Sequence, residues 1–311
     1  MLKRWQLALL ACPVCKSKLV PQKTHLVCKK CSREYGFKSD FPILIPDLTE
    51  DTKLTMEKWD QLYAHKLKIG EYIKDMMGYQ ADHQPAIVEQ VNEIYQPKKG
   101  NVYLEIGCGP AYLGLYYGKK GVTIVGIDIS ISALKIAQKL ARQYRIKNTL
   151  FVCGDITQMP FATGVFNIVY GGGVIEHFRA TQAVVSDSYR ILKKKGVSFN
   201  SVPCLNIGTI YRFKWGNIPN IPVVRQIAEF INLQLLGGRH MTFGYELSFL
   251  RPTLISLHTK AGFAARKIQV GKYRTIILLE RIGNIWLRKL FTYLCSENEL
   301  FWPMYKVIAV K

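Results

Sequence analysis

Three apolar runs in the middle of the chain end in residues that suit a nucleotide-like ligand. The first run, VYLEI, is followed by Gly107 and Gly109, and the next two runs end in Asp128 and Asp155. Apolar runs of this length, separated by helical patterns, are typical of parallel strands whose carboxyl ends meet at one edge of a sheet. We therefore expect the chemistry of this protein at that edge.

Each of these residue types suits one part of such a ligand. Gly107 and Gly109 lack a β-carbon, so the backbone can turn tightly and approach a ligand closely. Asp128 ends the second run, where its carboxylate can accept hydrogen bonds from both hydroxyls of a ribose. Asp155 and the apolar Ile156 after it suit an exocyclic amine and the face of an adenine. The glycines by themselves also fit a nicotinamide dinucleotide site or a turn without any ligand.

Four cysteines near the N-terminus form a second pattern with a chemical meaning. Cys12 and Cys15 lie in CPVC, and Cys28 and Cys31 lie in CKKC after twelve intervening residues. Two such turns can direct four thiolates at one tetrahedral zinc ion. Four protein ligands leave no open position, so this pattern predicts a structural Zn2+ and not a catalytic one. A module this small needs a metal because it cannot bury enough apolar surface unaided.

The segments EIGCGP, GIDIS, GDITQMPF, FNIVYGGGVIEHF and YRILKKKGVSFNSVP resemble successive motifs of class I S-adenosylmethionine-dependent methyltransferases, over Asn101 to Pro203 and less closely to about Val270. This resemblance implies S-adenosyl-L-methionine as the cofactor. It also implies that Glu105, Gly107 and Gly109 surround its methionine moiety. Ala111 departs from the pattern, because a third glycine is common at this position. The run from Leu7 to Asp47 is similar to the zinc-ribbon family that includes the activating subunit of transfer-RNA methyltransferases.

The fold class that these observations predict is α/β. The resemblance implies a Rossmann-like, doubly wound, seven-stranded methyltransferase sheet with a small N-terminal zinc-ribbon domain. We expect the ribbon at residues 1–50, a linker over Pro46 to Lys53, and the methyltransferase domain at 51–311 with an acceptor-lid insertion at about 204–250. The pattern of apolar residues predicts five strands, at Val102–Ile106, Thr123–Ile127, Thr149–Val152, Val165–Tyr170 and Val197–Val202.

Two amphipathic helices precede the first of these strands. Met56, Trp59, Tyr63 and Leu67 recur at helical spacing, and a second helix is predicted from about Pro85 to Tyr95. We expect both helices to pack on the cofactor pocket or to cap it. Trp59 and Tyr63 either close over the ligand or belong to the core.

His177 is the candidate catalytic residue. It follows the fourth strand in GGGVIEHF, and imidazole titrates near neutrality, so it could take a proton from an acceptor hydroxyl or an activated carbon. The alternative is that Glu176 and His177 begin the next helix and organise the cofactor loop. The segment from Gly237 to Phe263 is similar to an acceptor lid in methyltransferases that modify sugars, lipids and quinones, which makes His240 and Tyr245 secondary acceptor candidates.

Composition limits the partners. The 311 residues include 43 Lys and Arg against 22 Asp and Glu, which gives a formal net charge of +21. Such a charge favours nucleic acid, an acidic membrane surface or a phosphorylated substrate, or it serves solubility alone. The stretches 206–238 and 282–311 mix large apolar residues with Arg and Lys, which is typical of helices on an anionic membrane and of ordinary helices with a solvated face. No run reaches the roughly 18 apolar residues that span a bilayer, so we expect a cytoplasmic protein that makes at most peripheral membrane contact.

The sequence thus predicts a methyltransferase that acts at oxygen or carbon of a small-molecule, glycan or lipid-linked acceptor. One alternative is an RNA (rRNA or tRNA) methyltransferase that uses the zinc module for RNA docking, which the net charge also suits. Another is a non-catalytic scaffold or activator with a degenerate cofactor pocket. No sequence feature indicates the oligomeric state.

Overall fold

The computed structural model describes residues 2–46, 50–207, 217–238, 244–274 and 284–311, with the side chains of 50–55 excepted. The chain divides into two compact units. Unit 1 contains Met1–Gly171, Asp187–Ser198 and Lys311, and unit 2 contains Gly172–Ser186 and Phe199–Val310. The two units divide the chain at positions other than residue 50. The domain boundary predicted at residue 50 therefore remains a prediction.

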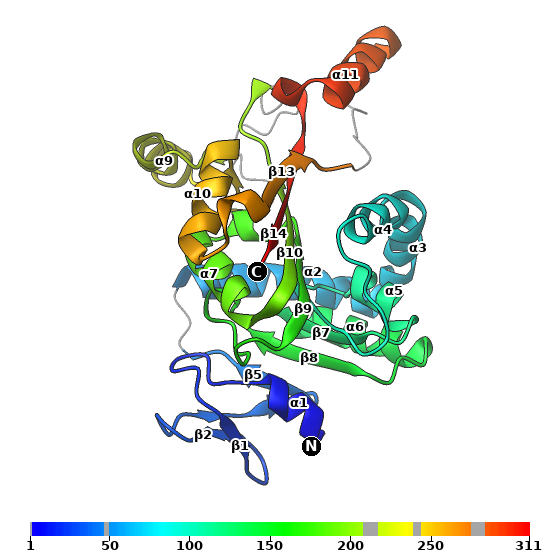
Figure 1. Cartoon of the computed structure of the whole chain (residues 1–311), viewed down its shortest axis with the longest axis vertical. Coiled ribbons are helices and arrows are strands. Elements are labelled where there is room, and N and C mark those ends of the chain that lie inside the picture. The colour runs from blue at the N-terminus through cyan, green and yellow to red at the C-terminus, as the bar shows by residue number, and fades with distance from the viewer. Residues whose placement is uncertain (1, 47–49, 208–216, 239–243, 275–283) are drawn as a thin grey trace. The chain divides into compact units, whose positions relative to one another are not determined.

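Unit 1 is built on a parallel-rich sheet with helical crossovers, which confirms the predicted fold class (Figure 1). Its hydrogen-bonded strand order is β10-β9-β6-β7-β8, followed by β5 and β4. The strands of the predicted alternation are β6 (Val102–Ile106), β7 (Thr123–Asp128), β8 (Thr149–Gly154), β9 (Phe166–Gly172) and β10 (Leu192–Pro203). Parallel pairing fixes their register, with Leu104 beside Val125 and Val169. These strands are almost wholly buried, as expected for a parallel sheet covered on both faces.

Helices α5 (Tyr112–Gly118), α6 (Ile131–Gln143) and α7 (Thr181–Ile191) follow β6, β7 and β9. The apolar side of α6 packs on β7 and β8 and buries Ala133, Ile136 and Leu140. Its N-terminus is capped by Ser130, whose side chain accepts a hydrogen bond from the Ala133 N–H. Strands β6 to β9 lie within about two residues of their predicted positions, because the hydrophobic period is unambiguous there, whereas β10 begins at Leu192, before the predicted start at Val197.

The N-terminal region contributes a small antiparallel sheet and two strands of the large one. After α1 (Arg4–Leu9), strands β1 (Leu19–Pro21), β2 (Leu26–Cys28) and β3 (Glu34–Tyr35) pair in sequence order. Strands β4 (Phe37–Lys38) and β5 (Phe41–Leu44) form a hairpin. Strand β5 then pairs in parallel with β8, with Ile43 opposite Cys153 and Leu44 opposite Gly154. The sheet that the resemblance implied is thereby extended at its β8 edge by β5 and β4.

Three helices connect this region to β6, namely α2 (Glu50–Ile69), α3 (Tyr72–Asp82) and α4 (Gln84–Asn92). The predicted linker over Pro46 to Lys53 was wrong in its second half, because α2 begins at Glu50. Its acidic first residues favour a helix N-terminus as much as a linker. Helix α3 was not predicted, since Gly78 and several polar residues weaken its helical pattern. In the structure Tyr72 and Met76 bury one side of α3 in the core of unit 1.

Unit 2 contains the second half of β10, which pairs with β14 (Met304–Val310), and β13 (Ile268–Lys272), which pairs antiparallel to β14. Its other elements are η2 (Ile175–His177), α9 (Pro222–Glu229), the π-helical turn η3 (Phe230–Leu235), α10 (Arg251–Ala261), α11 (Ile285–Glu297) and the short pair β11 (Ile218–Pro219) and β12 (Leu247–Ser248). Gly262 ends α10 in the left-handed conformation, with φ 112°. Residues 208–216 and 239–243 of the predicted lid insertion, including His240, lie outside the described residues. Among the described helices, none combines the length and the apolar character needed to span a bilayer.

Candidate cofactor, zinc and catalytic sites

The loop between β6 and α5 winds through three residues in the left-handed conformation. Gly107 has φ 54°, Gly109 has φ 49° and Ala111 has φ 57°. This conformation costs a residue with a β-carbon about 1–2 kcal/mol, and glycine avoids the cost. Ala111 tolerates it at the position where the sequence pattern departs from glycine. Its methyl group is fully buried in the core of unit 1, which offsets part of the strain.

Asp128, at the end of β7, is bound directly to this loop. Its Oδ2 accepts a hydrogen bond from the N–H of Gly109 at 2.7 Å, and its Oδ1 accepts one from the N–H of Ser130 at 2.8 Å. The Asp128 side chain is buried, and burial raises its pKa. The hydrogen bonds from backbone N–H groups oppose this shift, because they stabilise the carboxylate. The carboxylate and the glycine loop that the sequence predicted as one site therefore lie in contact.

A second buried carboxylate lies below the same loop. Oε2 of Glu105 accepts a hydrogen bond from the N–H of Gly114 in the first turn of α5 at 2.8 Å. Burial raises the pKa of Glu105 to about 8, and the nearby charge of Asp128 acts in the same direction. Two acidic groups in one poorly solvated site favour a cationic ligand, because a positive charge would stabilise both carboxylates.

Asp155 and Ile156 follow β8 at the neighbouring position of the same sheet edge. Asp128 pairs with Cys153, so Asp155 lies two residues beyond the end of β7. Oδ1 of Asp155 accepts hydrogen bonds from the N–H and the hydroxyl of Thr157, both at 2.8 Å. Ile156 is 3% exposed. The six residues predicted to bind a cofactor thus all lie in unit 1, at the carboxyl ends of β6, β7 and β8 or in the loops that follow them.

Tyr63 of helix α2 lies against the glycine loop and also packs on the hydrophobic core of unit 1, so both sequence interpretations of this residue remain open. A β-carbon added at Gly109 would lie 2.8 Å from the hydroxyl oxygen of Tyr63. Burial and the charge of Asp128 raise the pKa of Tyr63. The ring of Trp59 stacks on that of Tyr63 at a centroid distance of 6.2 Å. These contacts place Tyr63 beside the candidate donor site, and Trp59 packs on Tyr63.

Sequence reasoning missed Asp60, which fastens α2 to the start of α6. Its Oδ1 accepts hydrogen bonds from the hydroxyl of Ser130 and the N–H of Ser132, both at 2.8 Å. Although burial opposes the shift, those hydrogen bonds lower the pKa of Asp60. The only signal in the sequence was an acidic residue next to the apolar stripe of α2, and such residues are common on solvated helix faces.

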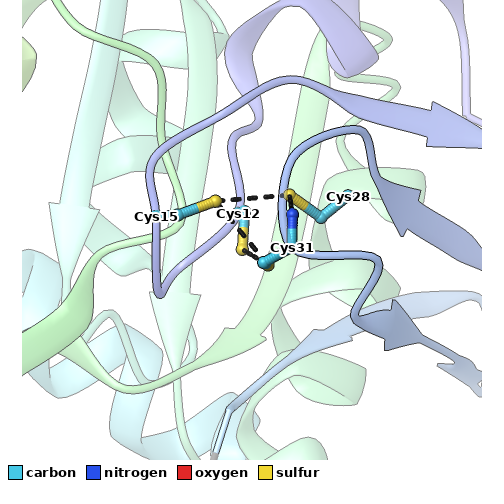
Figure 2. A group of neighbouring side chains, drawn as sticks. All are labelled: Cys12, Cys15, Cys28 and Cys31. Carbon is cyan, nitrogen blue, oxygen red and sulfur yellow. Dashed lines mark hydrogen bonds between the residues drawn. The ribbon is translucent and has the colours of Figure 1, made fainter.

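The four cysteines come together at the N-terminal turns (Figure 2). Their Sγ atoms all lie within 4.8 Å of one another, and three of the distances between them are 3.3 Å, 3.6 Å and 3.7 Å. A tetrahedral zinc with Zn–S bonds of about 2.3 Å would separate its sulfurs by roughly 3.8 Å. The N–H groups of Lys30 and Cys31 point at Sγ of Cys28, and the hydroxyl of Tyr35 lies 3.2 Å from Sγ of Cys12. These donors suit thiolate ligands, so the residues present fit the predicted zinc ion.

The two cysteine turns share one backbone conformation. The residue after the second cysteine of each turn is left-handed, with φ 58° at Lys16 and φ 56° at Ser32. A backbone hydrogen bond at Ser17 and the neighbouring thiols lower the pKa of the Cys15 thiol to about 6. At Cys31, a backbone hydrogen bond at Arg33 is outweighed by desolvation and by the other thiols, which raise the pKa to about 12. Metal ligation requires the thiolate forms, which a bound dication would stabilise in all four cysteines.

The first cysteine turn is tied to the segment that follows Asp155 and Ile156. The ammonium of Lys16 donates to the carbonyl of Met159 at 3.2 Å and lies 3.1 Å from Oδ2 of Asp187. Arg190 donates to the carbonyls of Phe161 and Met159 at 2.7 Å and 3.1 Å. The backbone adds two hydrogen bonds, from Ala11 to Pro160 and from Ala162 to Leu9. The sequence did not predict this connection, because Asp187 and Arg190 follow the helical pattern of α7 and carry no separate signal.

His177, the candidate general base, belongs to unit 2. Its Nδ1 lies 2.7 Å from the backbone carbonyl oxygen of Tyr245. A carbonyl can only accept, so Nδ1 carries the hydrogen and the lone pair of the imidazole resides on Nε2. This is the arrangement that orients a histidine base through its other nitrogen. Glu176, the neighbouring candidate, is 2% exposed in the short helix η2.

The Tyr245 side chain is held in a network of charged residues. Its hydroxyl donates to Oε1 of Glu229 at 2.5 Å, and the same oxygen accepts from Nε of Arg225 at 2.9 Å. The guanidinium carbons of Arg179 and Arg225 lie 5.3 Å and 5.9 Å from the centre of the Tyr245 ring. Although burial opposes it, these hydrogen bonds lower the pKa of Glu229. Tyr245 is a secondary acceptor candidate. Its backbone carbonyl orients His177, and its side chain is held by Glu229 of α9.

Comparison with known proteins identifies the central part of the chain. Residues 104–199 match a family described as a methyltransferase domain. Among curated proteins, ajmaline N-methyltransferase of Rauvolfia serpentina is 27% identical over 143 residues, which are 43% of this chain and 49% of that protein. The malonyl-[acyl-carrier protein] O-methyltransferase of Legionella pneumophila is 36% identical over 97 residues, or 30% of this chain and 33% of that protein. The chain thus spans about half and about a third of the lengths of these two relatives.

Solved structures share the fold. One is a chain from the complex between the Haloferax volcanii Trm112 methyltransferase activator and a methyltransferase, with a TM-score of 0.54, 12% identity, and coverage of 80% of this chain and 96% of that chain. Another is an S-adenosylmethionine-dependent methyltransferase from Mesorhizobium loti, with a TM-score of 0.51, 15% identity, and coverage of 73% and 98%. At these identities the similarity concerns the fold, which is that of Rossmann-like methyltransferases.

Proposed function

We propose that this chain, whose residues 104–199 belong to the methyltransferase domain family, transfers a methyl group from S-adenosyl-L-methionine to a small-molecule, glycan or lipid-linked acceptor. The observation that carries the proposal is the contact between the glycine loop and the carboxylate of Asp128, with Glu105 buried beneath. This arrangement provides a tight backbone turn and two acidic groups for a ligand that is both a nucleoside and a cation.

We assign the donor site residue by residue. Gly107 and Gly109 allow the backbone to approach the methionine moiety, and Asp128 accepts hydrogen bonds from the ribose hydroxyls. Asp155 and Ile156 bind the adenine end, and Glu105 orders the loop through the N–H of Gly114. Tyr63, whose hydroxyl lies close to Gly109, excludes water from the same place.

For the acceptor we propose transfer to oxygen or carbon with His177 as the general base. The bound cofactor supplies an electrophilic methyl group on a sulfonium. The Tyr245 carbonyl holds the Nδ1 hydrogen of His177, so that Nε2 can take the proton from an acceptor hydroxyl as the new bond to the methyl carbon forms. The sulfur of the cofactor would keep the electron pair of the sulfur–methyl bond, and the imidazole of His177 would hold the proton until solvent removes it.

Calorimetric titration with S-adenosyl-L-methionine tests the donor site. Asp128→Ala should weaken binding about 10- to 100-fold, since hydrogen bonds to a charged group contribute about 1.5–3 kcal/mol. Asp82→Ala, which removes an exposed carboxylate at the end of α3, is the matched control and should bind like the wild type. Wild-type protein that is folded and zinc-loaded but does not bind the cofactor would contradict the donor site and favour a scaffold function.

Single-turnover methyl transfer tests His177 separately. We expect His177→Ala to keep cofactor affinity and lose about 100-fold or more in rate, within the usual contribution of a general base. An unchanged rate with an acceptor of known identity would show that positioning suffices and that His177 is not the base.

We also propose that Cys12, Cys15, Cys28 and Cys31 hold a structural Zn2+. Elemental analysis of purified protein should find one zinc per chain, and Cys28→Ser should release it and unfold the N-terminal sheet. Tyr35→Phe, which removes the hydroxyl beside Cys12 but no ligand, should retain the metal. Full zinc occupancy in Cys28→Ser would disprove the ligand assignment.

One observation favours RNA as a second candidate acceptor. A cavity of about 980 Å3 in unit 1 lies between the N-terminal region and α6, and its lining includes Lys3, Lys23, Arg142 and Lys147 against a single acidic residue, Asp40. A basic groove of this kind suits a phosphate backbone. Labelled methyl groups recovered in RNA, lost in Lys23→Glu and Arg142→Glu, would favour this candidate over the lipid-linked or small acceptor. We also propose a cytoplasmic location, because four of the eight cysteines form the candidate zinc cluster and the other four are buried, where a reduced thiol packs as a small apolar residue.

A further inference from the structure

Helix α9 and the π-helical turn η3 in unit 2 have their polar side packed and their apolar side exposed. Arg225 and Glu229 on one side of α9 bind each other and the hydroxyl of Tyr245. The opposite side carries Val223, Ile227 and Phe230, which recur at steps of four and three residues and are 67%, 56% and 57% exposed. Leu235 at the end of η3 is 65% exposed. Amphipathic helices of globular domains normally bury the apolar side, so this reversal requires a reason.

Helix α11, coloured red in Figure 1, belongs to the same unit and carries a second exposed apolar stripe. Trp286, Leu290 and Tyr293 lie four and three residues apart and are 74%, 51% and 63% exposed. Cys295, the buried residue of this helix, lies on the opposite side of the helical wheel. Lys289 places its ammonium 5.2 Å from the ring centre of Trp286. The apolar stripe is thus bordered by a cation, and an aromatic residue with an adjacent cation is typical of residues at a membrane interface.

The charge of the chain selects among the partners that such a surface fits. A second copy of the chain would match the apolar residues, but two chains of net charge +21 repel each other. RNA would match the charge but would leave the exposed Val, Ile, Phe and Leu side chains without an apolar partner. An anionic lipid bilayer offers negative head groups above an apolar layer, and it satisfies both properties at once.

We propose that the exposed apolar side of α9 and η3, together with the stripe of α11, is a docking surface for an anionic lipid bilayer. The proposal deepens the function proposed above, on which it rests for the idea that the acceptor is a lipid. Glu229 of α9 binds the Tyr245 hydroxyl, and the Tyr245 carbonyl orients His177. The helix that contacts the bilayer therefore also fixes the residue that positions the proposed base, and this connection favours a lipid acceptor.

Vesicle flotation without cofactor tests the docking by itself. The full chain should float with vesicles of phosphatidylglycerol in phosphatidylcholine, and far less with phosphatidylcholine alone or at high salt. The double variant Ile227→Ser and Phe230→Ser should lose at least about tenfold in vesicle affinity, because it removes two large side chains from the contact. Ile69→Ser with Met77→Ser, which changes two equally exposed apolar residues of α2 and α3, is the matched control and should bind like the wild type.

Tryptophan fluorescence provides an independent measurement. Vesicle binding should shift the emission to the blue, and Trp286→Phe should abolish the shift while most of the vesicle affinity remains. Cofactor titration and the thermal transition of each variant distinguish lost docking from lost folding, since the substituted side chains are exposed and do not line the donor site.

Three results would overturn the proposal. The first is wild-type protein that does not float with anionic vesicles at low salt. The second is equal flotation of the wild type and the Ile227/Phe230 variant. The third is a wild-type dimer by light scattering that the variant converts to a monomer, which would assign the surface to a second copy of the chain. Cofactor binding is measured separately, so failure of the docking leaves the proposed methyl transfer standing, and failure of cofactor binding leaves the docking standing.

Discussion

The ammonium of Lys16 lies 3.1 Å from the carboxylate of Asp187, so the turn that follows Cys15 is joined to a helix 171 positions further along the chain. Asp187 also accepts a hydrogen bond from Arg190 at 2.8 Å, and Lys16 and Arg190 both reach the carbonyl of Met159. One carboxylate thus compensates two partly buried cations. It connects the candidate zinc turn to the segment after Asp155.

Asp187→Asn should destabilise the protein by about 1–2 kcal/mol, because it leaves two cations without their common partner. Chemical denaturation measures the change. Asp75→Asn is the matched control, since Asp75 pairs with Lys66 at 2.7 Å on a more exposed surface and should cost less than about 1 kcal/mol. Equal changes in the free energy of unfolding would show that Asp187 stabilises the protein no more than the exposed ion pair of Asp75 does.

Cofactor affinity should depend on pH through Glu105. Its pKa of about 8 means that the buried carboxyl is mostly protonated at pH 7. A cationic ligand favours the ionised form, so binding should release a proton, and affinity should rise as the pH increases towards about 8, by at most about tenfold per pH unit. Glu105→Gln should flatten this dependence in calorimetric titrations. If the cofactor affinity of the wild type varied as little with pH as that of the variant, ionisation of Glu105 would not affect cofactor binding.

His258 should make unit 2 sensitive to acid. The side chain is fully buried in α10, its Nδ1 lies 2.8 Å from the carbonyl oxygen of Leu254, and burial lowers its pKa to about 4 from an ordinary value of 6.5. Below pH 6.5 the unfolded chain binds a proton at His258, whereas the folded chain does not bind it until the pH approaches about 4. The free energy of unfolding should therefore be intact above about pH 6.5 and fall by about 3 kcal/mol as the pH decreases to about 4.

Urea denaturation at several pH values should find this loss in the wild type and in His65→Leu, which changes an exposed histidine of α2. The loss should be much smaller in His258→Leu, because leucine does not bind a proton in either state. A pH profile of His258→Leu that parallels the wild type would contradict the assignment to His258.

Arg145→Gly should stabilise unit 1. Arg145 follows α6 in the left-handed conformation with φ 56°, its N–H donates to the carbonyl of Arg142, and the next N–H donates to Ala141. This is the C-terminal motif in which glycine is preferred, and relief of the strain should contribute about 1 kcal/mol. Thermal unfolding should show a transition about 2 °C higher. Arg145→Ala removes the same charge but keeps the strain, so it should show no such gain.

The sequence by itself determined the central sheet and the composition of the two candidate sites. Strands β6, β7 and β8 lie at or within about two residues of their predicted positions, because a buried parallel strand leaves an unambiguous apolar run. Gly107, Gly109 and Asp128 were predicted as one site, since the carboxyl ends of adjacent parallel strands must meet. The four cysteines were predicted as one cluster, because the spacing of their turns already specifies a shared centre.

Only the tertiary structure decided how distant segments join, because such contacts leave no period in the sequence. Asp60 on α2, Asp187 before β10 and the pairing of β5 with β8 each depend on which surfaces meet. The same holds for α9, whose amphipathic pattern predicts a helix but does not tell which side is buried. Tyr245 fixes that orientation by binding Glu229, and the apolar side is thereby left for another partner. Local sequence specifies helices, strands and their polar stripes, whereas the packing of one element on another selects which stripe faces the solvent.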